Sequence, residues 1–134
     1  MYKHVMLDLE TIGTSTKSAI ISIGAIAFNL DEQDEYKTLI HSHSRLFSRN
    51  IHPDDWTHPG FDINGHTLSW WFDQSDHARA PFRPQKWGEE SRLVHVLNNF
   101  TAFFVQNGAT HVWGNGANFD NPILRNAYET LGPP

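Results

Sequence analysis

A chain of 134 residues has the length of one domain, and with 39% hydrophobic residues it can form a packed core, which excludes a disordered chain. The absence of cysteine excludes disulfides, thiolate chemistry and cysteine-based zinc sites. A net charge of −5 argues against a broad basic surface for nucleic acid, although acidic residues that ligate metal ions are compatible with phosphate chemistry. The sequence has no signal-peptide pattern and no apolar stretch long enough to span a bilayer, so we expect a cytoplasmic protein without a membrane partner.

The first part of the chain predicts three strands. Residues 5–7 are an apolar run that ends at Asp8, which is typical of a short buried strand. Residues 19–30 are rich in isoleucine and predict a second strand, antiparallel to the first because the connection is so short. Residues 31–35 are a charged turn, and residues 36–51 predict the third strand.

The middle of the chain predicts loops around one short helix. Residues 52–66 carry two prolines and two glycines and are expected to be irregular. Residues 67–73 predict a short helix with Thr67 as its N-cap, and residues 74–88 predict a second loop.

The last third of the chain contains the clearest helix. Apolar side chains recur at three- and four-residue spacing over residues 89–107, and Gly108 is expected to end this helix. Residues 111–113 predict a fourth strand, followed by a turn and a helix with Pro122 near its first turn. The order β-β-β-α-α-β-α predicts a single α/β domain over residues 1–134, with a mixed sheet flanked by helices.

Three carboxylates lie where strands are expected to end. Asp8 and Glu10 are two positions apart, so on a strand they share one face, and Asp120 begins a helix just after the fourth strand. Three carboxylates without cysteine suit a hard cation such as Mg²⁺ or Mn²⁺, and a pair of such ions could stabilise both oxygens of a phosphodiester displacement. The structural alternative stays open, in which Glu10 is a turn residue and Asp120 caps its helix.

Two short motifs carry a family resemblance over essentially the whole chain. Residues 6–11 (MLDLET) match the first motif of the DEDD superfamily of 3′→5′ exonucleases, which has a ribonuclease H-like fold, and residues 116–120 (GANFD) match the second. Within that superfamily the sequence is most similar to a small bacterial and phage branch, which includes a phage exodeoxyribonuclease and mycobacterial-type exoribonucleases.

The resemblance implies roles for particular residues. It implies that Asp8, Glu10 and Asp120 are catalytic and hold two Mg²⁺ or Mn²⁺ ions. It implies that the substrate-binding residues at the 3′ end are Thr11, Ile12, Asn118 and Phe119. The implied reaction is hydrolysis of the terminal phosphodiester of single-stranded DNA or RNA, which releases nucleoside 5′-monophosphates. Homodimers occur in the superfamily, so a homodimer is a possible assembly.

The third motif of the superfamily, which supplies a fourth carboxylate and a general base, has no match. After Asp120 the sequence contains neither His nor Asp, and Tyr128 has no carboxylate at the required spacing. His4 and His111 begin their strands and are therefore expected at the wrong end of the sheet. We therefore expect a C-terminally truncated fold, with little exonuclease activity in this fragment alone.

Aromatic and basic residues in the middle of the chain allow two interpretations. Residues 70–72 (WWF) could stack on bases, although we expect one tryptophan in the core. Arg79, Arg83 and Lys86 beside Trp87 could contact a nucleic-acid backbone, but a solvated loop is the interpretation we favour.

Three classes of function remain to be weighed. The leading one is the metal-dependent exonuclease, and the second is a catalytically inert nucleic-acid-binding or interaction module that keeps the fold. An unrelated magnesium phosphohydrolase would need a nucleophile or a phosphate loop that the sequence lacks. Whether the substrate is DNA or RNA depends on contacts to the 2′-hydroxyl, which the sequence does not reveal.

Overall fold

The core of the protein is a four-stranded mixed sheet. The computed structural model describes residues 1–31, 43–83, 85–114 and 119–131. Its strands are β1 (His4–Thr11), β2 (Ile20–Phe28), β3 (Leu46–Asn50) and β4 (His111–Gly114), in the order β3-β2-β1-β4. The β1–β2 and β2–β3 pairs are antiparallel, as expected for the first pair, and β4 is parallel to β1.

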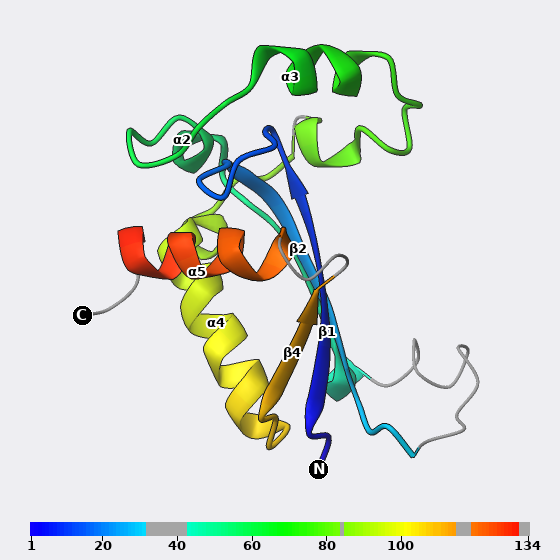
Figure 1. The fold of residues 1–134 in the computed structure, drawn as a ribbon. Helices are drawn as coiled ribbons and strands as arrows, with labels where there is room; N and C mark the ends of the chain where they lie inside the picture. Colours follow the sequence, from blue (N-terminus) through cyan, green and yellow to red (C-terminus); the bar gives the residue numbers. More distant parts are fainter. Residues whose placement is uncertain (32–42, 84, 115–118, 132–134) are drawn as a thin grey trace.

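Helices cover one face of this sheet (Figure 1). The alternation of β1 sends Val5, Leu7 and Leu9 into the core, where they pack against α4 (Leu93–Gln106) and α5 (Asp120–Leu131). The helices supply the facing side chains, which are Val96, Leu97, Phe100, Phe103, Ile123, Leu124 and Ala127. These elements confirm the predicted α/β class, with the mixed sheet and flanking helices of a ribonuclease H-like fold.

Most of the remaining elements lie around the end of the sheet where β1 ends. They are α2 (Pro53–Trp56), α3 (Gly65–Phe72) and two 3₁₀ turns, η2 (Ala80–Phe82) and η3 (Glu89–Ser91). A third 3₁₀ turn, η1 (His43–Arg45), lies at the opposite end of the sheet, because it leads into β3, whose first residue Leu46 pairs with Ile26 beside Met6. Figure 1 shows α3 beyond the tip of β1, away from the N-terminus. Within the part of the chain described, no helix has the length and apolar character needed to cross a membrane.

Two boundaries in the first half differ from the sequence-based expectation. The third strand was expected over residues 36–51, but β3 covers only Leu46–Asn50, the 3₁₀ turn η1 precedes it, and residues 36–42 lie outside the described part. The segment 52–66 was expected to be irregular, but it contains α2. Pro53 suits the first turn of that helix, and the ring Nδ1 of His52 accepts a hydrogen bond from the Asp54 amide at 3.1 Å.

The helix expected over residues 67–73 begins earlier, and its cap is a different residue. The structure places α3 at Gly65–Phe72 with Asn64 as N-cap, so the assignment of Thr67 as cap is wrong. The Asn64 side-chain oxygen accepts a hydrogen bond from the Thr67 amide at 2.9 Å, because Thr67 is the third residue of the first turn.

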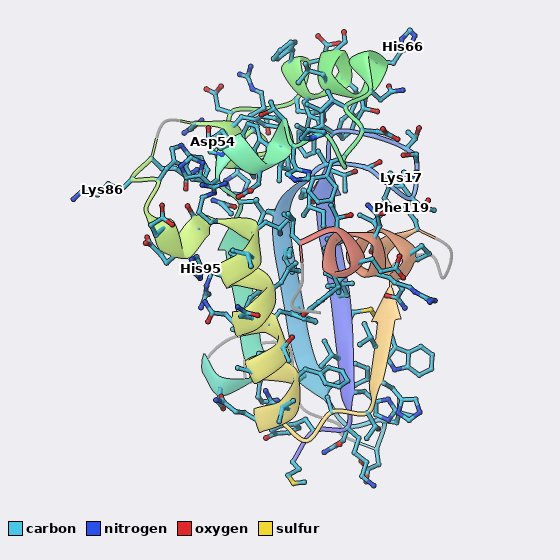
Figure 2. The ribbon with its side chains drawn as sticks, turned by 90° about the vertical axis from the view of Figure 1, so that its left-hand side faces the viewer. Lys17, Asp54, His66, Lys86, His95 and Phe119 are labelled. Atoms are coloured by element: carbon cyan, nitrogen blue, oxygen red, sulfur yellow. The ribbon has the colours of Figure 1, made fainter. Side chains whose placement is uncertain are left out.

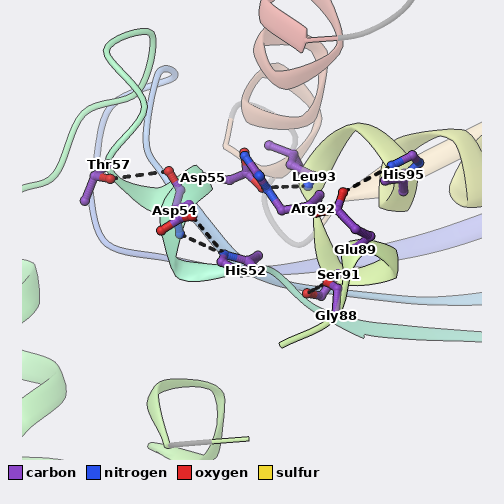
Figure 3. Close-up of polar contacts among 10 residues, drawn as sticks. All are labelled: His52, Asp54, Asp55, Thr57, Gly88, Glu89, Ser91, Arg92, Leu93 and His95. Carbon is purple, nitrogen blue, oxygen red and sulfur yellow. Dashed lines mark hydrogen bonds and ion pairs between the residues drawn. The ribbon is translucent and has the colours of Figure 1, made fainter. Parts of the chain in front are cut away.

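The helix expected over residues 89–107 is interrupted at Arg92. The 3₁₀ turn η3 comes first, Arg92 is extended with ψ 138°, and α4 begins only at Leu93. The cause is Asp55 of α2, whose carboxylate accepts a hydrogen bond from the Leu93 amide at 2.8 Å and holds the Arg92 guanidinium at 2.9 and 3.1 Å (Figure 3). Asp55 therefore caps α4 from another element. The far end is as expected, since α4 ends before Gly108, which has a φ of 74°.

Candidate active site

Asp8 and Glu10 lie near the end of β1, on the face of the sheet opposite α4 and α5. Their neighbours in the core-facing positions, Leu7 and Leu9, are buried, whereas Asp8 is exposed and Glu10 is half-buried. The partners across β2 are small, because Asp8 pairs with Gly24 and Glu10 with Ser22. The two carboxylates thus share one face, as predicted, beside positions without bulky side chains.

Asp120 is far from Asp8 and Glu10 in the sequence but lies at the same end of the sheet. It is the first residue of α5 and is 3% exposed. Because β4 is parallel to β1, it points to the same end of the sheet, and its last residue Gly114 pairs with Leu7, next to Asp8. A Cβ atom added at Gly114 would lie 3.2 Å from the Asp120 Cβ and 3.0 Å from the Asn121 side-chain oxygen, so glycine allows α5 to start close to the strand.

The negative charges of Asp8 and Asp120 act on Glu10. The pKa of Glu10 is raised, first by its partial burial and then by the negative charges of Asp8 and Asp120. Proximity of this kind is what the sequence predicted for the three residues. As they are oriented, however, no group of three His, Cys, Asp or Glu side chains in the described ranges is arranged to hold a metal ion.

Thr11 and Ile12 make contacts that stabilise the fold. The Thr11 hydroxyl donates a hydrogen bond to the Gly13 carbonyl at 3.0 Å, and the Thr11 carbonyl accepts one from the Trp71 indole nitrogen at 2.8 Å. The Ile12 side chain is 2% exposed and packs with Ile21 and Trp71 in a small second core. Their contact with a 3′ end therefore stays a prediction, and in this structure both side chains are buried.

The remaining two predicted substrate residues precede α5. Asn118 lies outside the described residues. Phe119 is half-buried at the start of α5, where its ring packs partly against the main core and its carbonyl accepts a hydrogen bond from the Ile123 amide at 3.2 Å (Figure 2). Its position beside Asp120 is compatible with the predicted contact to a terminal nucleotide.

Five histidines of the described residues have defined positions in the fold. His4 and His111 pair at the far end of the β1–β4 ladder, with ring centroids 5.0 Å apart. The ring nitrogens of His52 and His58 accept hydrogen bonds from nearby backbone amides, and His66 points outward from α3 (Figure 2). None of these five contributes to a three-residue metal-binding group within the described residues.

Two cavities next to the end of β1 were not expected from the sequence. A cavity of about 380 Å³ lies between the β1–β2 turn, at Gly13–Ser15, and the segment Phe61–Asn64. A second cavity, of about 520 Å³, lies between Thr14 and the start of α3 and is lined by Asn64 and Trp70. The signal in the sequence was Asn64, because asparagine is a preferred N-cap residue and marks the start of the helix that borders the second cavity.

The aromatic run 70–72 divides between core and surface. Trp71 is 4% exposed, which confirms that one tryptophan belongs to the core, whereas Trp70 is 54% exposed and Phe72 is 65% exposed. Among the predicted basic residues, Arg79 and Arg83 line a cavity with Phe72, while Lys86 is exposed and extends away from the molecule (Figure 2).

The sequence of the chain matches a known exonuclease family. The family model described as 3′-5′ exoribonuclease Rv2179c-like domain matches residues 3–134. The chain belongs to this Rv2179c-like family. It is also similar to a protein named exodeoxyribonuclease from Enterobacteria phage T4, with 27% identity over 132 residues. That match covers 89% of this chain and 52% of the phage protein, so the chain spans about half the length of this relative.

Membership in the Rv2179c-like family confirms the resemblance drawn from residues 6–11 and 116–120. The family model and the phage protein are both named for exonucleases, so the chain is a domain of an exonuclease family. The description of the family model refers to RNA, whereas the name of the phage protein refers to DNA.

Proposed function

We propose that this domain hydrolyses the terminal phosphodiester at the 3′ end of single-stranded nucleic acid and releases nucleoside 5′-monophosphates. The observation that carries the proposal is the placement of Asp8 and Glu10 on one face of β1, with Asp120 at the start of α5 at the same end of the sheet, in a member of an exonuclease family. Phosphodiester hydrolysis places negative charge on the attacking and leaving oxygens, and carboxylates that ligate cations bring compensating positive charge to that point.

Asp8, Glu10 and Asp120 are the residues that would hold divalent cations, Mg²⁺ or Mn²⁺. The donors fit such ions, because they are the carboxylate oxygens that hard cations prefer. The pKa of Glu10 is raised first by partial burial and then by the negative charges of Asp8 and Asp120, and a bound cation would neutralise those charges. Bound ions of this kind supply a Lewis acid and lower the pKa of a coordinated water. The side chains would have to reorient, since as they stand no described group of three completes a ligand set.

The protein itself would position the nucleotide. Asp120 is fixed at the start of a helix packed on the core, and Phe119 beside it offers an apolar surface to the terminal base. The buried Thr11 and Ile12 support the end of β1, on which Asp8 and Glu10 stand. We propose slow turnover for the 134-residue chain, because three carboxylates do not fully compensate two divalent ions and the family's general base has no identified counterpart.

Substitution of Asp8 tests the assignment of the site. With a single-stranded octamer labelled at its 5′ end, the wild-type chain in Mn²⁺ should produce a ladder that shortens from the 3′ end. Asp8→Asn should reduce that rate by about 100-fold or more, because loss of one group that stabilises the transition-state charge typically costs about 10²–10³ in rate. Parallel assays with DNA and RNA octamers show which of the two nucleic acids the domain cleaves.

The matched control is Asp31→Asn, which removes one exposed carboxylate outside the site. It should leave the rate within a factor of about two, as expected for an exposed residue distant from the chemistry. An equal loss in both variants, or cleavage that persists in Asp8→Asn, would show that the site is misassigned.

The second candidate is a module that binds nucleic acid without cleaving it. Its basis is the sequence, in which the third motif of the superfamily, with its fourth carboxylate and general base, has no match. Binding of the octamer with no release of mononucleotides in either Mg²⁺ or Mn²⁺ would favour this candidate over the exonuclease.

A further inference from the structure

An apolar pocket with a charged rim lies between α3 and η2. Its volume is about 280 Å³, and its lining residues are Trp71, Phe72, Asp76, Arg79, Phe82 and Arg83. This volume lies just below the range of about 300–1,000 Å³ that is usual for ligand pockets, so the pocket suits a group of the size of one base. It is separate from the end of β1, where the carboxylates lie.

The walls of the pocket are aromatic. Trp71 and Phe82 have ring centroids 5.4 Å apart, with planes inclined at 59°, and both belong to or pack against the small second core. Phe72 is 65% exposed and belongs to the lining of the pocket. A rigid inner wall and an exposed outer ring together provide a stacking surface that does not distinguish one base from another.

The rim of the pocket carries two guanidinium groups and one carboxylate. Asp76 lies 2.6 Å from Arg79 and 4.0 Å from Arg83, so it holds both guanidinium groups at the same edge. The Asp76 side chain is 80% exposed, and exposed ion pairs contribute little to stability. Exchange of this carboxylate for a phosphate therefore costs little, and two cations against one anion leave the rim positive in a chain of net charge −5.

We propose that this pocket binds one nucleotide of the single-stranded substrate upstream of the 3′ end that is cleaved. The base stacks on Phe72 against Trp71 and Phe82, and the adjacent phosphate accepts hydrogen bonds from Arg79 and Arg83. The assignment rests on the proposed function, and it gives the domain a preference for strands longer than a dinucleotide. It replaces the solvated-loop interpretation for Arg79 and Arg83.

One hydrogen bond connects the pocket to the candidate active site. Trp71 forms the inner wall, and its indole nitrogen donates to the carbonyl of Thr11 at 2.8 Å, in the residue directly after Glu10. The same helix exposes Trp70 to the cavity beside Thr14. A nucleic-acid strand bound in the pocket would therefore contact α3, the helix that is hydrogen-bonded to the end of β1.

Binding of a labelled octamer in EDTA tests the pocket without any cleavage. Phe72→Ala and Arg83→Ala should each weaken binding about tenfold, in line with the contribution of one stacked base or one phosphate contact. Phe72→Ala should have no such effect on an octamer that lacks bases, whereas Arg83→Ala should still weaken its binding. Arms with oligo(dT) and oligo(U) establish whether the site distinguishes DNA from RNA.

Matched controls separate the pocket from general effects of charge and surface. Arg125→Ala removes an exposed arginine of α5, and Val105→Ala removes a 67% exposed apolar side chain of α4. Both should bind the octamer within about twofold of the wild type, since exposed positions outside a site rarely contribute more. Circular dichroism of Phe72→Ala and Arg83→Ala checks that these exposed substitutions leave the fold intact.

The outcomes of this test distinguish the inference from the proposed function. If Phe72→Ala and Arg83→Ala bind the octamer like the wild type, or if the wild type does not bind it at all, the pocket is overturned even when Asp8→Asn behaves as expected. If they weaken binding while no cleavage is detected in Mn²⁺, the pocket stands and the exonuclease proposal fails.

Discussion

Glu10 is the residue at which the three carboxylates of the candidate site meet. Its pKa is raised, first because it is half-buried and then because the negative charges of Asp8 and Asp120 lie close to it. A folded chain that holds three anions together without a cation is less stable than it could be, because their mutual repulsion is relieved on unfolding. The charge that suits the site to metal binding therefore lowers the stability of the metal-free protein.

Glu10→Gln should raise the stability of the metal-free protein and abolish its response to metal. In EDTA we expect Tm to rise by about 2 °C, because removing one half-buried like charge relieves a fraction of a kcal/mol. Added Mn²⁺ should raise Tm of the wild type but not of Glu10→Gln, since a ligand that binds only the folded state stabilises it. Differential scanning calorimetry in both buffers measures the two shifts.

Glu90→Gln is the comparison for this measurement, since Glu90 is an exposed carboxylate of η3 outside the site. Its Tm should follow that of the wild type in both buffers. A full Mn²⁺ response in Glu10→Gln would remove Glu10 from the proposed ligands.

At the scale of secondary structure, the start of α4 depends on a residue far away in the sequence. Asp55 is 6% exposed in α2, and its carboxylate binds both the Arg92 side chain and the Leu93 amide. Burial alone would raise the pKa of Asp55, but the hydrogen bonds from Arg92 and Leu93 and the charge of Arg92 outweigh it, so the pKa is lowered. The ionised carboxylate therefore stabilises the contact between α2 and α4.

Asp55→Asn should lower the free energy of unfolding by about 2 kcal/mol at neutral pH, because it weakens a charge-assisted capping contact. The pKa of Asp55 is lower in the folded than in the unfolded chain, so its stabilisation is fully present above its ordinary pKa. It is lost as the pH falls through the lowered folded value. Urea unfolding at neutral and acid pH should therefore show a difference between wild type and variant that shrinks on acidification.

Glu129→Gln serves as the matched change for Asp55→Asn, since Glu129 forms an exposed pair with Arg125 one turn earlier on α5. It should cost no more than about 0.5 kcal/mol. An equal cost for both substitutions would contradict a special role of Asp55.

The elements differ in how far the sequence could predict them. The apolar positions of α4 and its end at Gly108 follow from local spacing, and the structure confirms them. The break at Arg92 could not be predicted, because its cause is Asp55, 37 residues earlier in the chain. The start of α3 at Gly65 was predictable in principle, since the capping signal from Asn64 is local.

The same division applies to the candidate site. The common face of Asp8 and Glu10 follows from the strand period, and the proximity of Asp120 follows from a helix that starts after a parallel strand. The pocket between α3 and η2 could not be read from the sequence. It depends on which of Trp70, Trp71 and Phe72 faces the core, and this is decided by packing against the end of β1.

For the whole molecule, the distribution of charge sets how nucleic acid approaches. The chain has 10 Lys and Arg against 15 Asp and Glu, so attraction to a polyanion has to be local. Arg79 and Arg83 at the pocket rim are the contacts that we assign in the absence of metal.

Binding of the octamer in EDTA should therefore depend only weakly on salt. Two phosphate contacts predict a slope of about −1.4 for log K against log salt concentration, since each contact to a single strand contributes about −0.7. Fluorescence anisotropy titrations over a series of salt concentrations measure this slope. A slope steeper than about −3 would indicate a broad basic surface and would contradict a local contact.

The parallel pairing of β1 with β4 has a consequence for how the domain folds. It joins His4 to His111, so the chain must close a loop of more than one hundred residues before Asp8 and Asp120 can meet. The antiparallel β1–β2 and β2–β3 pairs join residues that are closer together in the sequence. Contacts between residues far apart in the sequence slow folding, because the entropy of loop closure is lost before the contacts form. We therefore expect the three antiparallel strands to pair before β4 docks. In a nascent or refolding chain, the candidate active site would be completed in that last step.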